Sequence, residues 1–186
     1  MSWHTVRLND VPSSPWRNGG GLTRELVAWP DSTDWTWRMS VAEVACGGPF
    51  SRFEGVQRGF AVLGGAGVRL TIGDQTHELT RTSAPLWFDA AVPVDCQLLD
   101  GATQDFNLML RGDQVAAKML RISGVENFVL DAPRVVAVYA IDAPATVLLD
   151  GCAQALAANS LAWQSLDRRA VVQIQGSDAL WMEIAL

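Results

Sequence analysis

The sequence predicts an all-β protein, and three observations lead to this prediction. Short segments alternate apolar and polar side chains, which is the periodicity of a half-buried strand. Clusters of Gly, Pro, Asn and Asp separate these segments at near-regular spacing, and helical periodicity is almost absent. Many short strands spaced in this way favour a sandwich or a barrel.

The expected strands of the N-terminal part follow one another closely. Residues 2–8 predict an edge strand, 9–21 a loop, and 23–29 a strand whose two faces are both partly apolar. Further strands are expected at 35–45, 50–53, 58–63, 68–72, 86–89, 94–99 and 105–111, with one short polar strand inside 74–84. The plainest alternation is in 35–45: one face is apolar, and the other carries Arg38, Ser40 and small residues. That second face suits either the wall of a wet cavity or a solvent-facing surface.

Residues 112–117 form the best candidate for a helix and also the best boundary between two domains. Beyond them, strands are expected at 118–122, 127–130, 134–141, 146–149, 160–164, 170–175 and 179–185. A shift of about 77 residues lays 62–86 over 139–163, so that their turns coincide. This weak repeat indicates two fused β-barrels, the first in residues 1–112 and the second in residues 113–186.

Composition excludes several classes of function. The formal net charge of −6 argues against a nucleic-acid partner, which would need a basic face. No apolar run reaches membrane-spanning length and the N-terminus has no signal pattern, so a cytoplasmic protein without a membrane partner is expected. The 3 cysteines lie far apart with no Cys-x-x-Cys pair, so neither a disulfide framework nor a thiolate zinc site is indicated.

Three successive glycines at 19–21 follow Trp16, Arg17 and Asn18 and precede a strand. Glycine is costly to order, so such a run is kept where φ is positive or where another group approaches the backbone closely. No Lys-Ser or Lys-Thr closes the run, so it is not a phosphate loop. Two interpretations stay open. Either the N–H groups of Gly19 and Gly20 and the Asn18 amide line a small ligand, or the glycines form a tight turn.

A family resemblance follows from these residues. Residues 15–21, Pro-Trp-Arg-Asn-Gly-Gly-Gly, together with Thr-Arg-Glu at 23–25, resemble the signature of the HutD/Ves family of cupin-like proteins. Further matches lie at 37–44, 48–53, 98–101 and 105–109, and the resemblance is much looser beyond Arg111. It implies a bicupin of two RmlC-like jelly-roll barrels, the second one degenerate. It also implies an accessory or regulatory role in histidine utilisation, with urocanate or N-formylglutamate as ligand. Other relatives are described as stress-induced proteins.

The chain departs from the metal-dependent cupins at their metal site. In the best register, Arg58 occupies the place of the metal-binding glutamate, and the His-x-His place falls within 51–54, where there is no histidine. With only 2 histidines in the chain, we expect neither a metal nor another cofactor. A fixed guanidinium at the barrel mouth should hold an anion instead.

The candidate ligand-binding residues combine cations, amides and an aromatic ring. One of three strand arginines is expected to face a small anionic ligand, unless acids such as Glu43, Glu54, Asp95 or Asp105 pair with them all. Two polar residues on one face of 105–111 could bind an amide, a ring nitrogen or a hydroxyl, and a phenylalanine could cover a flat ligand. The set is Asn18, Gly19, Gly20, Arg24, Arg38, Ser40, Phe53, Arg58, Asp105 and Asn107.

Three functions remain open at this level. The first is a ligand-binding cupin with no catalytic residue. The second is a metal-independent isomerase or hydrolase that uses Glu43 or Asp105 as general base. The third is an interaction module whose barrel surface pairs with a partner chain, for example in a homodimer. The evidence for it is the unusual tryptophan count, which includes Trp3, Trp29 and Trp181.

Overall fold

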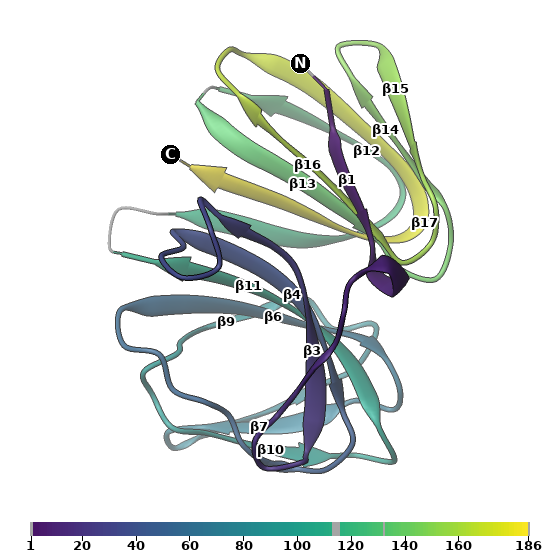
Figure 1. Cartoon of the computed structure of the whole chain (residues 1–186). Helices are drawn as coiled ribbons and strands as arrows, with labels where there is room; N and C mark the ends of the chain where they lie inside the picture. The colour runs from purple at the N-terminus through teal and green to yellow at the C-terminus, as the bar shows by residue number, and fades with distance from the viewer. Residues whose placement is uncertain (1, 113–115, 132, 186) are drawn as a thin grey trace. The chain divides into compact units, whose positions relative to one another are not determined.

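The structure is a computed structural model that describes residues 2–112, 116–131 and 133–185. Within these residues strands are the predominant element, and the one helical element is the short 3-10 turn η1 (Leu8–Asp10) (Figure 1). The all-β prediction is therefore confirmed. Half of the helix expected at 112–117, residues 113–115, lies outside the described residues, and Ala117 begins strand β12. No helix in the described part of the chain has the length and hydrophobicity needed to span a bilayer.

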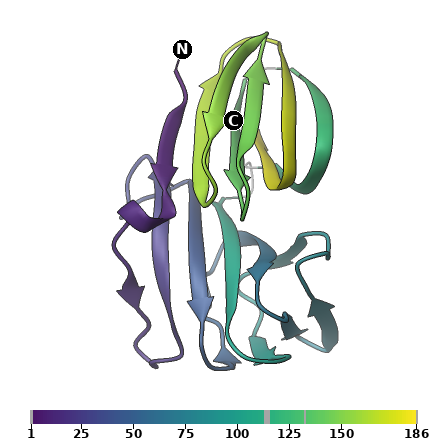
Figure 2. The ribbon, with the colours of Figure 1, turned by 90° about the vertical axis from the view of Figure 1, so that its right-hand side faces the viewer.

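The chain divides into two compact units. The N-terminal unit comprises Val11–Asp113, and the C-terminal unit comprises Met1–Asp10 together with Gln114–Leu186. The first ten residues were expected in the N-terminal unit, but strand β1 (His4–Arg7) pairs with strand β16 of the C-terminal unit. Figure 2 shows this purple strand beside that unit's strands. The His4 ring stacks on Trp163 at 4.3 Å, and the Leu8 N–H donates to the Asn159 carbonyl oxygen.

The N-terminal unit contains two antiparallel sheets. The six-stranded sheet runs β2 (Ser14–Pro15), β3 (Gly21–Trp29), β4 (Trp37–Val44), β11 (Thr103–Arg111), β6 (Val56–Gly64), β9 (Leu86–Asp89). The four-stranded sheet runs β5 (Gly48–Pro49), β10 (Val94–Leu98), β7 (Val68–Ile72), β8 (Gln75–Leu79). Apolar residues of both sheets, among them Phe60, Val62, Leu70 and Val94, pack into one core. The strand expected at 50–53 is instead a loop that follows β5.

Strand register brings the polar residues of the large sheet together. Met109 on β11 lies opposite Arg38 on β4 and opposite Arg58 on β6, so the two arginines flank β11 on one face. Asn107 lies two residues along β11 on the same face, opposite Ser40. Alternation on β4 buries Trp37, Met39 and Val41 on the other face, as the sequence pattern predicts.

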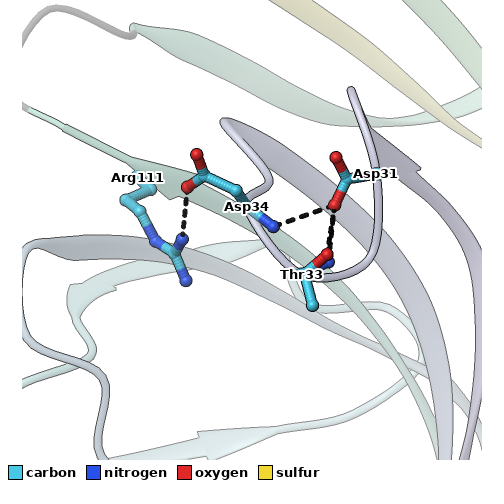
Figure 3. A network of polar contacts seen from close by, with 4 residues as sticks. All are labelled: Asp31, Thr33, Asp34 and Arg111. Atoms are coloured by element: carbon cyan, nitrogen blue, oxygen red, sulfur yellow. Dashed lines mark hydrogen bonds and ion pairs between the residues drawn. The ribbon is translucent and has the colours of Figure 1, made fainter.

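The loop between β3 and β4 is fixed by its own side chains (Figure 3). Asp31 Oδ1 accepts hydrogen bonds from the Thr33 N–H at 2.8 Å, the Thr33 hydroxyl at 2.6 Å and the Asp34 N–H at 3.0 Å. These bonds, the Thr33 hydroxyl first, lower the pKa of Asp31. Arg111 pairs with Asp34 at 3.5 Å and lies over the Trp35 ring at 4.2 Å, which ties the loop to the end of β11.

The C-terminal unit is one strongly bent antiparallel sheet with an apolar core. Its strand order is β1, β16 (Ser160–Leu166), β13 (Arg134–Ala140), β17 (Ala170–Ala185), β14 (Ala145–Leu149), β15 (Cys152–Leu156), and β12 (Ala117–Leu130) pairs with β17. The sequence predicts two separate strands in the place of β12 and two in the place of β17, whereas each is one long strand in the structure. The sequence does not predict β15. A register shift at Gly124, whose φ is +97°, marks the break expected within β12.

The weak repeat in the sequence matches the strands of the structure. Adding 77 to the bounds of β7 (68–72) and β8 (75–79) gives the bounds of β14 (145–149) and β15 (152–156). The order β4-β11-β6-β9 in the N-terminal unit also corresponds to β12-β17-β13-β16 in the C-terminal unit. The two units therefore share a strand plan, and the closure of each unit into a barrel stays a prediction.

Candidate ligand-binding site

A cavity of about 490 Å³ opens within the N-terminal unit, a volume typical of small-molecule sites. Its walls come from strands β2 to β6 and β11 and from the loops that follow β2 and β5. The lining residues are Pro15, Trp16, Arg17, Asn18, Thr23, Arg38, Ser40, Ala42, Pro49, Phe50, Ser51, Phe53, Arg58, Asn107 and Met109.

The charge of this lining is opposite to that of the chain. Three arginines, Arg17, Arg38 and Arg58, line the cavity and no acidic residue does, although the whole chain carries a net charge of −6. A concave surface with like charges and partly apolar walls concentrates the field inside it. The cavity is therefore electropositive and suits an anion.

Arg58 is a buried cation held by neutral groups. Its Nε–H and Nη2–H donate to Asn107 Oδ1 at 2.8 and 2.6 Å, and its guanidinium carbon lies 4.3 Å from the centre of the Phe50 ring. Burial lowers the pKa of Arg58 to about 10, with the charge of Asp105 acting in the opposite direction, so the group stays cationic at neutral pH. Within the described residues, no carboxylate lies in ion-pair range of Arg58 and no acceptor binds its Nη1.

Arg38 contributes a second positive charge that is only partly offset. Its Nε lies 2.8 Å from Glu25 Oε2, and Glu25 also accepts a hydrogen bond from the Ser32 hydroxyl through its other oxygen. The Arg38 side chain is about one fifth exposed, at 21%. Glu25 therefore orients Arg38 from one side, while the rest of the guanidinium remains at the cavity.

The glycine run forms a turn, and its N–H groups do not line the cavity. The Gly19 N–H donates to the Trp16 carbonyl at 3.0 Å, and the Gly20 N–H donates to Asn18 Oδ1 at 3.0 Å. Gly19 has a φ of +70°, and a Cβ on Gly21 would lie 2.4 Å from the Glu43 carbonyl oxygen. Positive φ and close backbone approach thus explain two of the glycines. The turn presents Arg17 and Asn18 to the cavity.

Arg24 and Asp105 also lie away from the cavity wall. Arg24 forms an ion pair with Glu43, the internal pairing that the sequence left open. Asp105 is fully buried opposite Val62, deeper in the apolar core, where its Oδ2 accepts from the Thr103 hydroxyl at 2.9 Å. Its Oδ1 has no partner among the described residues. Burial raises the pKa of Asp105 to about 7, opposed by the Thr103 hydrogen bond and by Arg58.

Comparison with known proteins identifies the relatives of this chain. A family model described as HutD matches residues 8–182. The chain belongs to the HutD family. An uncharacterised 21.2 kDa protein from the hutC 3′ region of Pseudomonas putida is 34% identical over 70% of each chain. Protein Ves of Cronobacter sakazakii is 37% identical over 60% of this chain and 62% of its own length.

Solved structures agree with this assignment. A conserved protein of unknown function from Pseudomonas aeruginosa PAO1 has a TM-score of 0.87 at 28% identity, covering 100% of this chain and 98% of its own. HutD from Pseudomonas fluorescens SBW25 has a TM-score of 0.84 at 27% identity, covering 99% and 98%. An oxalate decarboxylase of Bacillus subtilis, with a TM-score of 0.65 at 11% identity over 97% of this chain and 76% of its own, shares the fold alone. The chain is thus a member of the HutD family whose fold is also found in an oxalate decarboxylase.

In this HutD-family chain, six of the ten candidate residues meet at one cavity. They are Asn18, Arg38, Ser40, Phe53, Arg58 and Asn107, while Gly19, Gly20, Arg24 and Asp105 lie elsewhere. The sequence missed Arg17, although it stands beside Asn18 in the HutD motif, and that adjacency was the available signal. No cluster of three or more His, Cys, Asp or Glu that could hold a metal ion occurs among the described residues.

Proposed function

We propose that this protein binds a small carboxylate in the cavity of the N-terminal unit and serves an accessory or regulatory role in histidine utilisation. The observation that carries the proposal is the lining of three arginines without an acidic residue. A buried guanidinium that lacks an ion pair is costly, and an anionic ligand supplies the missing partner. Arg58 is in this position within the described part of the chain.

Urocanate and N-formylglutamate are the proposed ligands. Both are small acids, one with a planar ring and the other with an amide, and the cavity offers groups that fit each feature. Phe50 and Phe53 supply flat apolar surfaces, and Asn18, Asn107 and Ser40 supply hydrogen-bonding groups. Membership of the HutD family is the reason for choosing acids from histidine utilisation as the proposed ligands.

A thermal-shift panel tests the proposal. Urocanate, N-formylglutamate, formate and histidine are added to the purified protein, each over a concentration series. An acid present at a hundred times its Kd adds about 2.7 kcal/mol of stability, and therefore raises the melting temperature by about 5–10 °C. We expect at least one acid to do so in a saturable way, and histidine methyl ester, which lacks the carboxylate, to have no effect. If no acid shifts the melting temperature, the proposal is wrong.

A metal-independent enzyme is the second candidate, and the raised pKa of Asp105 is the observation that favours it. A carboxyl group with a pKa of about 7 is suited to general base catalysis. Its burial beneath the cavity wall counts against direct contact with a ligand, and the ion pair with Arg24 counts against Glu43 in this role. Incubation of the best-binding acid with the protein, followed by product analysis, separates binding from turnover.

A further inference from the structure

We infer that the cavity selects an ionised carboxylate because both of its amide side chains are turned to present only donors, and that Asn107 is the residue that decides this selectivity. The inference rests on the proposed function and names the group that enforces it. It concerns the orientation of Asn107 and Asn18, the only two amide side chains in the cavity lining.

The Asn107 amide can adopt only one orientation. A guanidinium has donors and no acceptor, so the Asn107 atom that meets Arg58 Nε and Nη2 must be the oxygen, at 2.8 and 2.6 Å. The Nδ2 group is then turned away from Arg58, and no acceptor among the described residues binds it. Asn107 is itself buried, at 3% exposure, so this orientation is held by its surroundings.

Asn18 repeats the arrangement at the rim of the cavity. Its Oδ1 accepts from the Gly20 N–H at 3.0 Å, so its NH₂ group is the end left for a ligand. The three arginines add further donors and no acceptors. A ligand atom that meets these groups must accept hydrogen bonds, and a carboxylate does this with both oxygens. The corresponding primary amide would direct its own NH₂ group at other donors.

The C-terminal unit shows what an acid does beside an arginine in the same strand register. Arg58 lies opposite Met109 and binds the side chain two residues earlier on β11. Arg134 in turn lies opposite Ala185 and binds the side chain two residues earlier on β17. There the partner is Glu183, whose Oε2 is 2.8 Å from Arg134 Nη1 and whose Oε1 accepts from the Trp181 indole N–H at 3.0 Å.

The side chain beside the arginine therefore determines whether its charge is available to a ligand. With an amide beside it, Arg58 is oriented and its charge is left for a ligand. With a carboxylate beside it, as at Arg134, the charge is matched within the protein. In an Asn107→Asp variant, one carboxylate oxygen would pair with Arg58 and the other would stand where the Nδ2 group faces the cavity, repelling an anionic ligand.

The test uses acetate and acetamide, which have the same shape and differ in charge and donors. Each is titrated into ¹⁵N-labelled full-length protein, and the backbone amide and arginine Nε–H signals are followed by NMR. We expect acetate to bind the wild type at least about 10-fold more tightly than acetamide, because a hydrogen bond to a charged group is stronger than one between neutral groups. In Asn107→Asp the acetate Kd should rise roughly 10- to 100-fold, with no loss of acetamide affinity.

Two further variants keep the test decisive. Asn127→Asp makes the same change at an exposed position in the C-terminal unit and should leave acetate binding unchanged. Asn18→Asp places a carboxylate at the exposed rim, where folding is not at risk, and should weaken acetate binding several-fold. Equal binding of acetate and acetamide by the wild type, or full acetate affinity in Asn107→Asp, would overturn the inference and leave carboxylate binding intact. If Asn107→Asp does not fold, full acetate affinity in Asn18→Asp would overturn it. Failure of the wild type to bind any carboxylate would overturn both.

Discussion

Replacement of Arg58 by methionine is expected to raise the Kd for the best-binding small acid about 100-fold. Methionine fills much of the same volume but removes the buried positive charge and the free Nη1 donor. Charge-assisted hydrogen bonds contribute roughly 1.5–3 kcal/mol each, and a hundredfold change corresponds to about 2.8 kcal/mol. Isothermal titration calorimetry of wild type and variant measures the ratio directly.

A matched control separates the effect of a charge in the cavity from the effect of the net charge of the protein. Arg69 on β7 belongs to the same unit, is exposed, and is paired with Glu78. The change Arg69→Met removes the same charge from the protein but not from the cavity, so the Kd should change less than about twofold, the level expected for a screened distant charge. Equal losses in Arg58→Met and Arg69→Met would show that net charge, and not the cavity, determines binding.

The change Asp105→Asn is expected to stabilise the protein above pH 7 and to make its stability less dependent on pH. The pKa of Asp105 rises from 3.8 to about 7 because the carboxyl is buried. A carboxyl group whose pKa is raised by folding contributes to the stability of the folded state while it is protonated. This contribution is complete only below the pKa that the group has in the unfolded state. This contribution is lost as pH rises from about 4 to about 7, and stability is then constant. Three pKa units correspond to about 4 kcal/mol.

Melting curves of wild type and Asp105→Asn between pH 4.5 and pH 8.5 measure this effect. The difference in melting temperature should grow with pH up to about pH 7 and reach on the order of 10 °C. The control Asp95→Asn, at an exposed residue on β10, should change the melting temperature much less than Asp105→Asn does. A constant difference for Asp105→Asn across the whole range would mean that Asp105 is ionised normally in the folded protein.

Much of the fold could be predicted because the alternation of apolar and polar residues that marks a strand is a local feature of the sequence. Alternation identified β4 and separated Arg38 and Ser40 from Trp37 and Met39, and the repeat placed β14 on β7. The partner of β1 could not be predicted, because pairing with β16 joins segments more than 150 positions apart along the chain and no local pattern encodes it. The sequence predicts a strand at 50–53, where the structure has a loop, because its two phenylalanines resemble a short apolar segment.

The candidate site was predictable to the extent that it follows strand alternation. Arg38, Ser40, Arg58 and Asn107 are placed by the pleat, and all four line the cavity. Asp105 lies on the same face of β11 as Asn107, but it lies deeper in the core and does not line the cavity. Strand alternation predicts the face on which a side chain lies and not its depth in the core, so this difference could not be predicted.

The most direct test of carboxylate binding is a crystal structure of the protein with the acid that gives the largest thermal shift. We predict the carboxylate in the N-terminal cavity, with one oxygen within about 2.7–3.2 Å of Arg58 Nη1 and of the Asn107 Nδ2 group. An acid bound elsewhere, or a carboxylate turned away from Arg58 towards solvent, would contradict the account.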